Sequence, residues 1–234
     1  MTSELVPWGV EAPSATRGLH TASVVQFPTR EIRAPRGVYV ELLKPAVDRV
    51  VAASLLVVSA VPMLVVAGVV AVSMGRPVLF RQRRVGLDGE EFEVLKFRTM
   101  RPDRRDQRLD VIHDRRRTHK TDRDPRHTSV GRMLRRYSLD ELPQLFNVLR
   151  GEMSIVGPRP ELRSVVDTYA PGLHQRHRVK PGLTGLWQIS ARGRGPMHEN
   201  GQWDLDYVEQ VSMRTDLWIM ARTPAAMFGA NTGS

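Results

Sequence analysis

The longest hydrophobic run of the chain extends from Val50 to Met74, and its 25 residues include no charged side chain. As one straight helix this run is roughly 38 Å long, enough to cross a bilayer core of about 30 Å. Pro62 lies in the middle, where it removes one backbone hydrogen bond and favours a sharp kink. Each arm would then reach only roughly 18 Å, so both ends would return to one membrane face. The pattern predicts a membrane helix broken at Pro62, with a buried helix of a soluble domain as the alternative.

A β-hairpin is predicted directly after this run. Val78 begins one strand, residues 92–97 alternate between polar and apolar on the other, and Leu87-Asp88-Gly89 supplies the turn. Lys96 and Arg98 are two residues apart and therefore point to the same face of the strand. This face is either solvated or turned toward an anionic ligand.

Helical spacing of apolar residues returns between residues 139 and 149 and predicts a helix there. Ser138 and Glu141 match a helix capping box, in which the serine accepts from the third backbone amide and the glutamate reaches back. Capping does not explain Asp140, the other member of this acidic pair. A carboxylate nucleophile set among cations is what chemistry on a phosphate requires, so catalysis is the alternative to a simple cap.

Several arginines and lysines are placed to serve such a site. A short helix over residues 129–136 would bring Arg135 beside the acidic pair. Pro158 and Pro160 restrict the backbone on both sides of Arg159, so its guanidinium would lose little entropy on binding a phosphate. Lys180 opens a glycine-rich loop whose exposed amides suit an anion. Each could equally be an ordinary surface cation.

The net charge of +10 is concentrated in one part of the chain. Residues 76–136 hold 19 basic against 10 acidic residues and so account for +9 of it. Such an excess favours an anionic partner: nucleic acid, an anionic membrane surface or a phosphorylated substrate. No aromatic residue is interleaved with the cations of residues 101–126, so this segment is expected to be a solvated loop rather than a nucleic-acid platform. Cysteine is absent, which excludes disulfides and thiolate sites.

Three long blocks resemble the bacterial sugar transferase family, the monotopic phosphoglycosyl transferases that start glycan assembly on a polyprenyl phosphate. The blocks are Lys96-Phe-Arg-Thr-Met100, the run from Ser138 to Pro160, and Lys180-Pro-Gly-Leu-Thr-Gly-Leu-Trp-Gln188. They occur in the family's order, and the resemblance covers residues 44–226.

The resemblance implies an α+β, mostly helical, monotopic membrane protein with a re-entrant helix broken at Pro62, a small β-hairpin and amphipathic surface helices. The expected divisions are a disordered arm over residues 1–37, the re-entrant helix over 38–76, a catalytic domain over 77–226 and a disordered tail over 227–234. The arm is also indicated by scattered prolines and by the lack of any sustained periodicity of apolar residues. The catalytic domain is expected at the inner face of the bacterial cytoplasmic membrane, because the stretch after the apolar run is basic.

The resemblance also implies a reaction. Asp140 would attack the β-phosphorus of a UDP-sugar, UMP would leave, and polyprenyl phosphate would take the sugar phosphate from the aspartate. Glu141 would assist, and Mg²⁺ bound through Asp140 would neutralise developing charge.

The remaining site residues follow from the same resemblance. Lys96 and Arg98 would border the active site, Arg135 would hold a substrate phosphate, and Arg159 would line the donor site. Asp204 is expected to pair with an active-site arginine, most simply Arg135. UDP-sugar, polyprenyl phosphate and membrane lipids are thus the expected partners, and nucleic acid is not. A membrane-anchored basic adaptor without catalysis is the alternative, and a soluble nucleic-acid binder is a third hypothesis.

Overall fold

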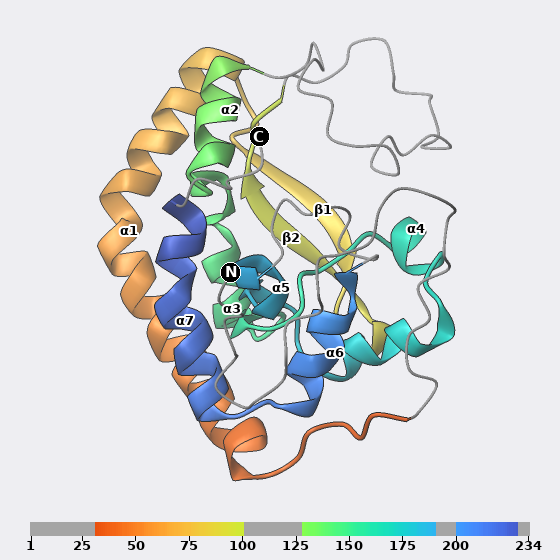
Figure 1. The fold of residues 1–234 in the computed structure, drawn as a ribbon. Coiled ribbons are helices and arrows are strands. Elements are labelled where there is room, and N and C mark those ends of the chain that lie inside the picture. The colour runs from red at the N-terminus through yellow and green to blue at the C-terminus, as the bar shows by residue number, and fades with distance from the viewer. Residues whose placement is uncertain (1–30, 101–127, 191–199, 229–234) are drawn as a thin grey trace, which may run out of the picture.

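The computed structural model describes residues 31–100, 128–190 and 200–228 (Figure 1). The predictions for residues 1–30, the charged loop at 101–126 and the tail after residue 228 lie outside the described residues. Within residues 31–37, which were assigned to the arm, the side chain of Ile32 is buried in the main hydrophobic core.

A single long helix forms one side of the molecule. A short π-helical turn, η1 (Tyr39–Leu43), leads into α1 (Lys44–Met74), which is helical throughout although Pro62 lies inside it. The break predicted at Pro62 is therefore not what the structure shows. Figure 1 shows a gently bowed rod, whose ends lie at opposite ends of the molecule. A proline removes only one hydrogen bond, and a helix of 31 residues retains enough others to continue past it.

One face of α1 packs against the rest of the protein along nearly its whole length. Buried positions recur at helical spacing, at Lys44, Asp48, Ala52, Val66 and Val70. The first part of this face contributes Ala52 to the main core, and the last part forms a second small core with Phe97 and Leu134.

The opposite face of α1 is apolar and exposed. It includes Val57, Val58, Val61, Leu64, Val65 and Val72, each at least 60% exposed. The segment Tyr39–Met74 is long and apolar enough to cross a membrane, and only 11% of its most apolar window is buried. A core helix of a soluble domain would be mostly buried, so the exposed face is typical of a helix in contact with lipid.

The predicted hairpin is confirmed. Strands β1 (Leu79–Val85) and β2 (Glu91–Phe97) pair antiparallel, with Phe80 opposite Lys96. The connecting turn is η2 (Leu87–Gly89), in which Asp88 adopts a left-handed conformation (φ 53°). An aspartate tolerates this conformation better than most residues do, which explains why the turn forms at this position.

The other described residues form mostly short helices, as expected for this fold class. The remaining elements are α2 (Ser129–Arg136), η4 (Leu139–Glu141), α3 (Gln144–Arg150), β3 (Ser154–Val156), α4 (Arg163–Val166), η5 (Pro171–Arg178), β4 (Gly182–Thr184), α5 (Leu186–Ser190), α6 (Gln202–Glu209) and α7 (Met213–Phe228).

A second small sheet, absent from the sequence prediction, holds the turn that contains Arg159. Strands β3 and β4 pair in parallel, with Val156 opposite Thr184. Just beyond them the two chain segments approach so closely that a Cβ atom on Gly182 would lie 2.1 Å from the backbone nitrogen of Gly157. Only glycine fits at this approach, and the loop that starts at Lys180 is therefore packed against the Arg159 turn.

Candidate active site

The acidic pair lies in a tight turn rather than in the first turn of a longer helix. Asp140 and Glu141 belong to the 3₁₀ turn η4, and α3 begins only at Gln144. Ser138 precedes them in a left-handed conformation (φ 54°) and makes no side-chain capping hydrogen bond. The capping-box prediction is therefore wrong, and helix capping no longer accounts for Ser138 or Glu141.

Glu141 is held by two cations from different parts of the chain. Lys96 Nζ, on β2, lies 2.9 Å from Glu141 Oε1, and Arg159 Nη2, in the rigid turn after β3, lies 2.7 Å from the same oxygen. Burial would by itself raise the pKa of Glu141, but Arg159 and Lys96 outweigh it and hold that pKa well below its ordinary value. Glu141 is thus a fixed anion at neutral pH.

Asp140 is in the opposite situation. Its side chain is 8% exposed and has no ion pair or hydrogen bond to any other side chain in the described part of the chain. Burial, together with the neighbouring charge of Glu141, raises the pKa of Asp140 to about 6. Two adjacent carboxylates with pKa values moved in opposite directions are typical of catalytic pairs with divided roles. Asp140 is the carboxylate that is available for chemistry.

The oxygen donors at this site suit Mg²⁺. No cluster of three or more metal-ligating side chains occurs among the described residues. Mg²⁺ is however commonly bound through one or two carboxylates together with the phosphates of a substrate. Asp140 is buried without a side-chain partner, and both cations of Glu141 contact the same oxygen, so carboxylate oxygens remain for a metal. The residues present therefore fit an ion that binds together with the diphosphate.

Arg98 does not reach this site, although it was predicted to face a phosphate. Its guanidinium donates hydrogen bonds to the carbonyl oxygens of Met74, Gly75 and Arg76 at the C-terminal end of α1. These are carbonyls that a helix end leaves without intrahelical partners. Arg98 thus caps α1, and the spacing that placed it on the same face as Lys96 does not give it the same role.

Lys180 also lies elsewhere. The charged groups that influence it are Arg49, Asp48 and Lys44 at the beginning of α1, and burial lowers its pKa. A Cβ atom placed on Gly151 would be 3.6 Å from Lys180 Nζ and 3.2 Å from Arg49. The side chain of Lys180 is therefore directed toward the end of α3, while its backbone supports the Arg159 turn.

Asp204 pairs with Arg176 and not with Arg135, so that part of the prediction is wrong. Arg176 Nη2 and Nε lie 2.6 and 2.9 Å from Asp204 Oδ2, and both residues are 1% exposed. Sequence reasoning missed Arg176 because nothing in its local pattern distinguishes it from Arg178, which pairs with Glu31 at the surface. The only local signal was its position in the helical segment that precedes Lys180.

Arg135 lies in the last turn of α2, close to η4 in sequence, and its carbonyl accepts a hydrogen bond from the Ser138 amide. The ion pairs of Glu141 are nevertheless with Lys96 and Arg159. The structure therefore brings together four of the predicted site residues: Lys96, Asp140, Glu141 and Arg159.

Comparison with known proteins gives concordant matches over most of the chain. The profile of the family described as "Bacterial sugar transferase" matches residues 39–230. The Exopolysaccharide production protein ExoY of Sinorhizobium fredii is 39% identical over 222 residues, which cover 92% of this chain and 96% of ExoY. The UDP-glucose:undecaprenyl-phosphate glucose-1-phosphate transferase of Xanthomonas campestris is 40% identical over 221 residues, covering 90% of this chain and 44% of that longer protein. The UDP-galactose-lipid carrier transferase of Erwinia amylovora is 36% identical over 188 residues, 77% of this chain and 39% of the relative.

Proposed function

The chain belongs to the bacterial sugar transferase family, and on that basis we propose that it transfers a sugar 1-phosphate from a UDP-sugar to polyprenyl phosphate and releases UMP. The observation that carries this proposal is the divided acidic pair. Asp140 is buried and has no side-chain partner among the described residues, while Glu141 binds both Lys96 and Arg159. The names of relatives point to UDP-glucose and UDP-galactose as the first donors to test.

In the first step, a carboxylate oxygen of Asp140 attacks the β-phosphorus of the UDP-sugar. The bond from that phosphorus to the UMP oxygen breaks, UMP leaves, and the sugar phosphate is held on Asp140 as an acyl phosphate, the aspartyl-phosphosugar. Lys96 and Arg159 offset the negative charge of the diphosphate, because Glu141 keeps both of them at the site. Glu141 thereby positions the cations rather than attacking the substrate itself.

In the second step, a phosphate oxygen of polyprenyl phosphate attacks the phosphorus of the aspartyl-phosphosugar. The bond to Asp140 breaks, the free carboxylate returns, and the product is a polyprenyl diphosphate sugar. Dividing the transfer into two displacements lets both phosphorylated substrates use the same cations in turn. Mg²⁺, when bound at Asp140 with the diphosphate, supplies further charge neutralisation.

We place α1 at the inner face of the cytoplasmic membrane, with its exposed apolar face in lipid. The opposite face packs against the catalytic domain from Lys44 to Val70, so the helix cannot cross a bilayer without taking that domain into the hydrocarbon. Entry into a single leaflet, which is the monotopic arrangement, agrees with this packing. It also brings the active site close to a lipid-borne phosphate.

UMP release by detergent-purified protein tests the reaction class. With Mg²⁺, polyprenyl phosphate and a panel of UDP-sugars, the wild type is expected to release UMP with at least one donor. Asp140→Asn should reduce the rate by at least about 10³-fold, because the nucleophile is lost. Arg163→Gln, which removes a partly exposed ion pair with Glu91, is the matched control and should retain the wild-type rate.

The covalent step has a separate test. Without polyprenyl phosphate, the wild type should gain the mass of one sugar phosphate and release UMP in a single burst, and Asp140→Asn should do neither. UMP release that persists in Asp140→Asn would contradict the covalent mechanism. An inactive wild type with every donor would contradict the transferase itself.

A further inference from the structure

The backbone on the N-terminal side of Arg159 is held by two buried side chains. Lys44 Nζ lies 3.1 Å from the carbonyl oxygen of Val156, and the hydroxyl of Tyr207 lies 2.9 Å from the same oxygen. Val156 ends β3 and is followed directly by Gly157-Pro158-Arg159. The Ser154 hydroxyl, 2.8 Å away within the same strand, is a third donor to this oxygen. The acceptor capacity of the carbonyl is therefore fully used, and Lys44 and Tyr207 tie the end of this strand to α1 and α6.

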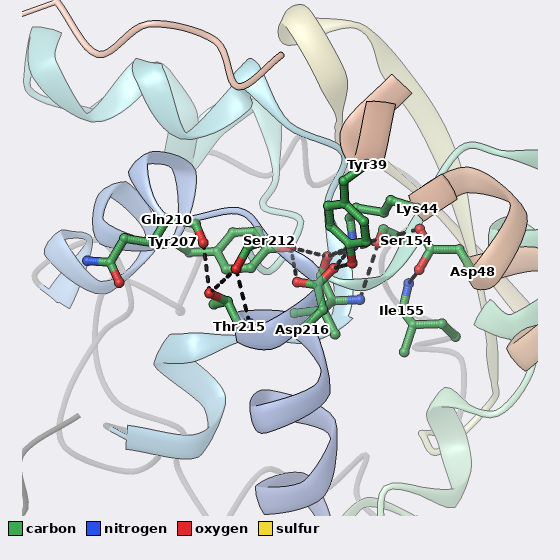
Figure 2. Close-up of polar contacts among 11 residues, drawn as sticks. Tyr39, Lys44, Asp48, Ser154, Ile155, Tyr207, Gln210, Ser212, Thr215 and Asp216 are labelled. Carbon is green, nitrogen blue, oxygen red and sulfur yellow. Dashed lines mark hydrogen bonds and ion pairs between the residues drawn. The ribbon is translucent and has the colours of Figure 1, made fainter. Parts of the chain in front are cut away.

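Asp216 organises these two donors. Its carboxylate accepts hydrogen bonds from Lys44 Nζ (2.6 Å) and the Tyr39 hydroxyl (2.6 Å). It also lies 2.8 Å from the Tyr207 hydroxyl, whose single hydrogen is shared between Asp216 and the Val156 carbonyl. Figure 2 shows the four side chains converging from η1, α1, α6 and α7. Asp216, Lys44 and Tyr207 are buried, with exposed fractions of 5%, 8% and 1%, and Tyr39 is half-buried at the edge of the network.

The carbonyl of Arg159 itself is held by a second buried group. Arg176 Nη2 lies 2.6 Å from the Arg159 carbonyl oxygen. The guanidinium of Arg176 is in turn fixed by Asp204 and by the hydroxyl of Tyr169, whose oxygen lies 2.8 Å from Arg176 Nη1. Arg159 thus has a buried, charge-assisted hydrogen-bond network on each side of it, at Val156 and at its own carbonyl.

We propose that these two networks clamp the turn that carries Arg159, and that Lys44, Tyr207, Asp216, Arg176 and Asp204 are positioning residues for the contact between Arg159 and Glu141. The kinetic part of this inference rests on the proposed function, whereas the structural part does not. None of the five is a catalytic residue. Lys44, Tyr207 and Arg176 contact the backbone of the turn or of the strand before it, Asp216 and Asp204 hold those three, and none of these hydrogen bonds involves the acidic pair.

The clamp gives a reason for the desolvation cost of the two buried ion pairs, which packing alone does not explain. Buried ion pairs are frequently no more stabilising than well-packed apolar side chains, so two of them around one short turn indicate a need for exact placement. Pro158 and Pro160 make the turn stiff, and a displacement at Val156 is therefore transmitted to Arg159 rather than absorbed. A misplacement of about 1 Å in a charge-stabilising group can reduce a rate by about 100-fold.

One network begins in the helix that we place at the membrane. Lys44 is the first residue of α1, and Tyr39 lies in the turn before it. A shift of α1 at the lipid surface would therefore move Lys44, and through the Val156 carbonyl it would change the position of Arg159. The active site is braced by the same helix that brings it to its lipid substrate.

Amide hydrogen exchange over residues 154–162 tests the clamp without relying on activity. Lys44→Met and Tyr207→Phe are each expected to accelerate exchange in this segment by about tenfold, because they remove donors from the Val156 carbonyl. Thr215→Val is the matched control. It also removes a buried hydroxyl beside Asp216, but that hydroxyl bonds to Ser212 and to the Gln210 carbonyl rather than to β3 (Figure 2). If Lys44→Met does not fold, Tyr207→Phe, which lacks only one oxygen atom, carries the test.

Equal exchange in wild type and Tyr207→Phe, or the same acceleration in Thr215→Val, would overturn the clamp.

Kinetics supply a second test. Lys44→Met should reduce turnover by about 10- to 100-fold in a wild-type background but by less than about twofold in an Arg159→Lys background, because its effect passes through Arg159. Fully additive losses would contradict that path. An inactive wild type would reject the proposed function and leave the exchange result to decide the clamp.

Discussion

Asp140 and Glu141 are neighbours in sequence, yet their surroundings move their pKa values in opposite directions. The 3₁₀ turn directs Glu141 to Lys96 and Arg159, and it leaves Asp140 buried without a side-chain partner in the part of the chain that the structure describes. Adjacent residues in a 3₁₀ turn point about 120° apart, so Glu141 can meet the cations while Asp140 points elsewhere. In the proposed mechanism this division makes Asp140 the nucleophile.

The first half-reaction should depend on pH through Asp140. Its pKa is about 6, and only the ionised form attacks. The rate of the UMP burst without polyprenyl phosphate should therefore rise about tenfold from pH 5 to pH 7 and then level off. Omitting the lipid keeps its own phosphate titration out of the profile. A burst rate that is constant over this range would contradict the assignment of Asp140.

Asp140→Asn should also stabilise the protein. An acid with a pKa of about 6 in the folded state and 3.8 ordinarily costs the fold up to about 3 kcal/mol above pH 6, and nothing when both states are protonated. After allowing for the amide's unmet hydrogen bonds, we expect a net gain of about 1 to 2 kcal/mol at pH 7.5. Thermal unfolding in detergent measures it. At pH 4.5 the cost of the acid falls to about a third while that of the amide is unchanged, so the net gain should disappear or become a small loss. A gain independent of pH would have another cause.

At the scale of elements, Arg98 joins the hairpin to the end of α1. Arg98→Met should lower the free energy of unfolding by about 1 to 3 kcal/mol, because three carbonyls at that end lose their donor. The KM for the UDP-sugar should stay within about twofold of wild type, since Arg98 does not contact the acidic pair. Lys96→Met is the counterpart on the same strand and should impair turnover. A large rise in KM for Arg98→Met would contradict this role and support the contact with a substrate phosphate that the sequence predicted for Arg98.

Local pattern was enough to predict several elements but not their partners. The hairpin and α2 follow from strand alternation, a turn sequence and a short amphipathic period, all of which act within about ten residues. The left-handed backbone at Ser138 converts an apparent capping box into a different turn, and no periodicity encodes it. Likewise, Asp204 pairs with Arg176 rather than with Arg135, because η5 packs against α6 and brings Arg176 within reach of Asp204.

At the scale of the whole molecule, α1 has one face on the catalytic domain and one face exposed. If it enters a single leaflet, both ends lie on the cytoplasmic side. The chain has no cysteine, so single cysteines introduced as Leu43→Cys and Arg76→Cys report on each end. In inverted inner-membrane vesicles an impermeant maleimide should label both, as it labels the exposed control Ser164→Cys on α4. In spheroplasts it should label none of them, whereas a membrane-spanning helix would expose one end.

The bond between Lys44 and Asp216 also sets an order of events during synthesis. The two residues are 172 positions apart. At about 5 to 20 residues per second, a ribosome needs roughly 10 to 30 s to reach Asp216 after Lys44 has emerged. During that interval α1 can already associate with lipid, but the strand before Arg159 lacks the carboxylate that organises its donors. The nascent enzyme should therefore reach the membrane first and become active only once its last helix has been made.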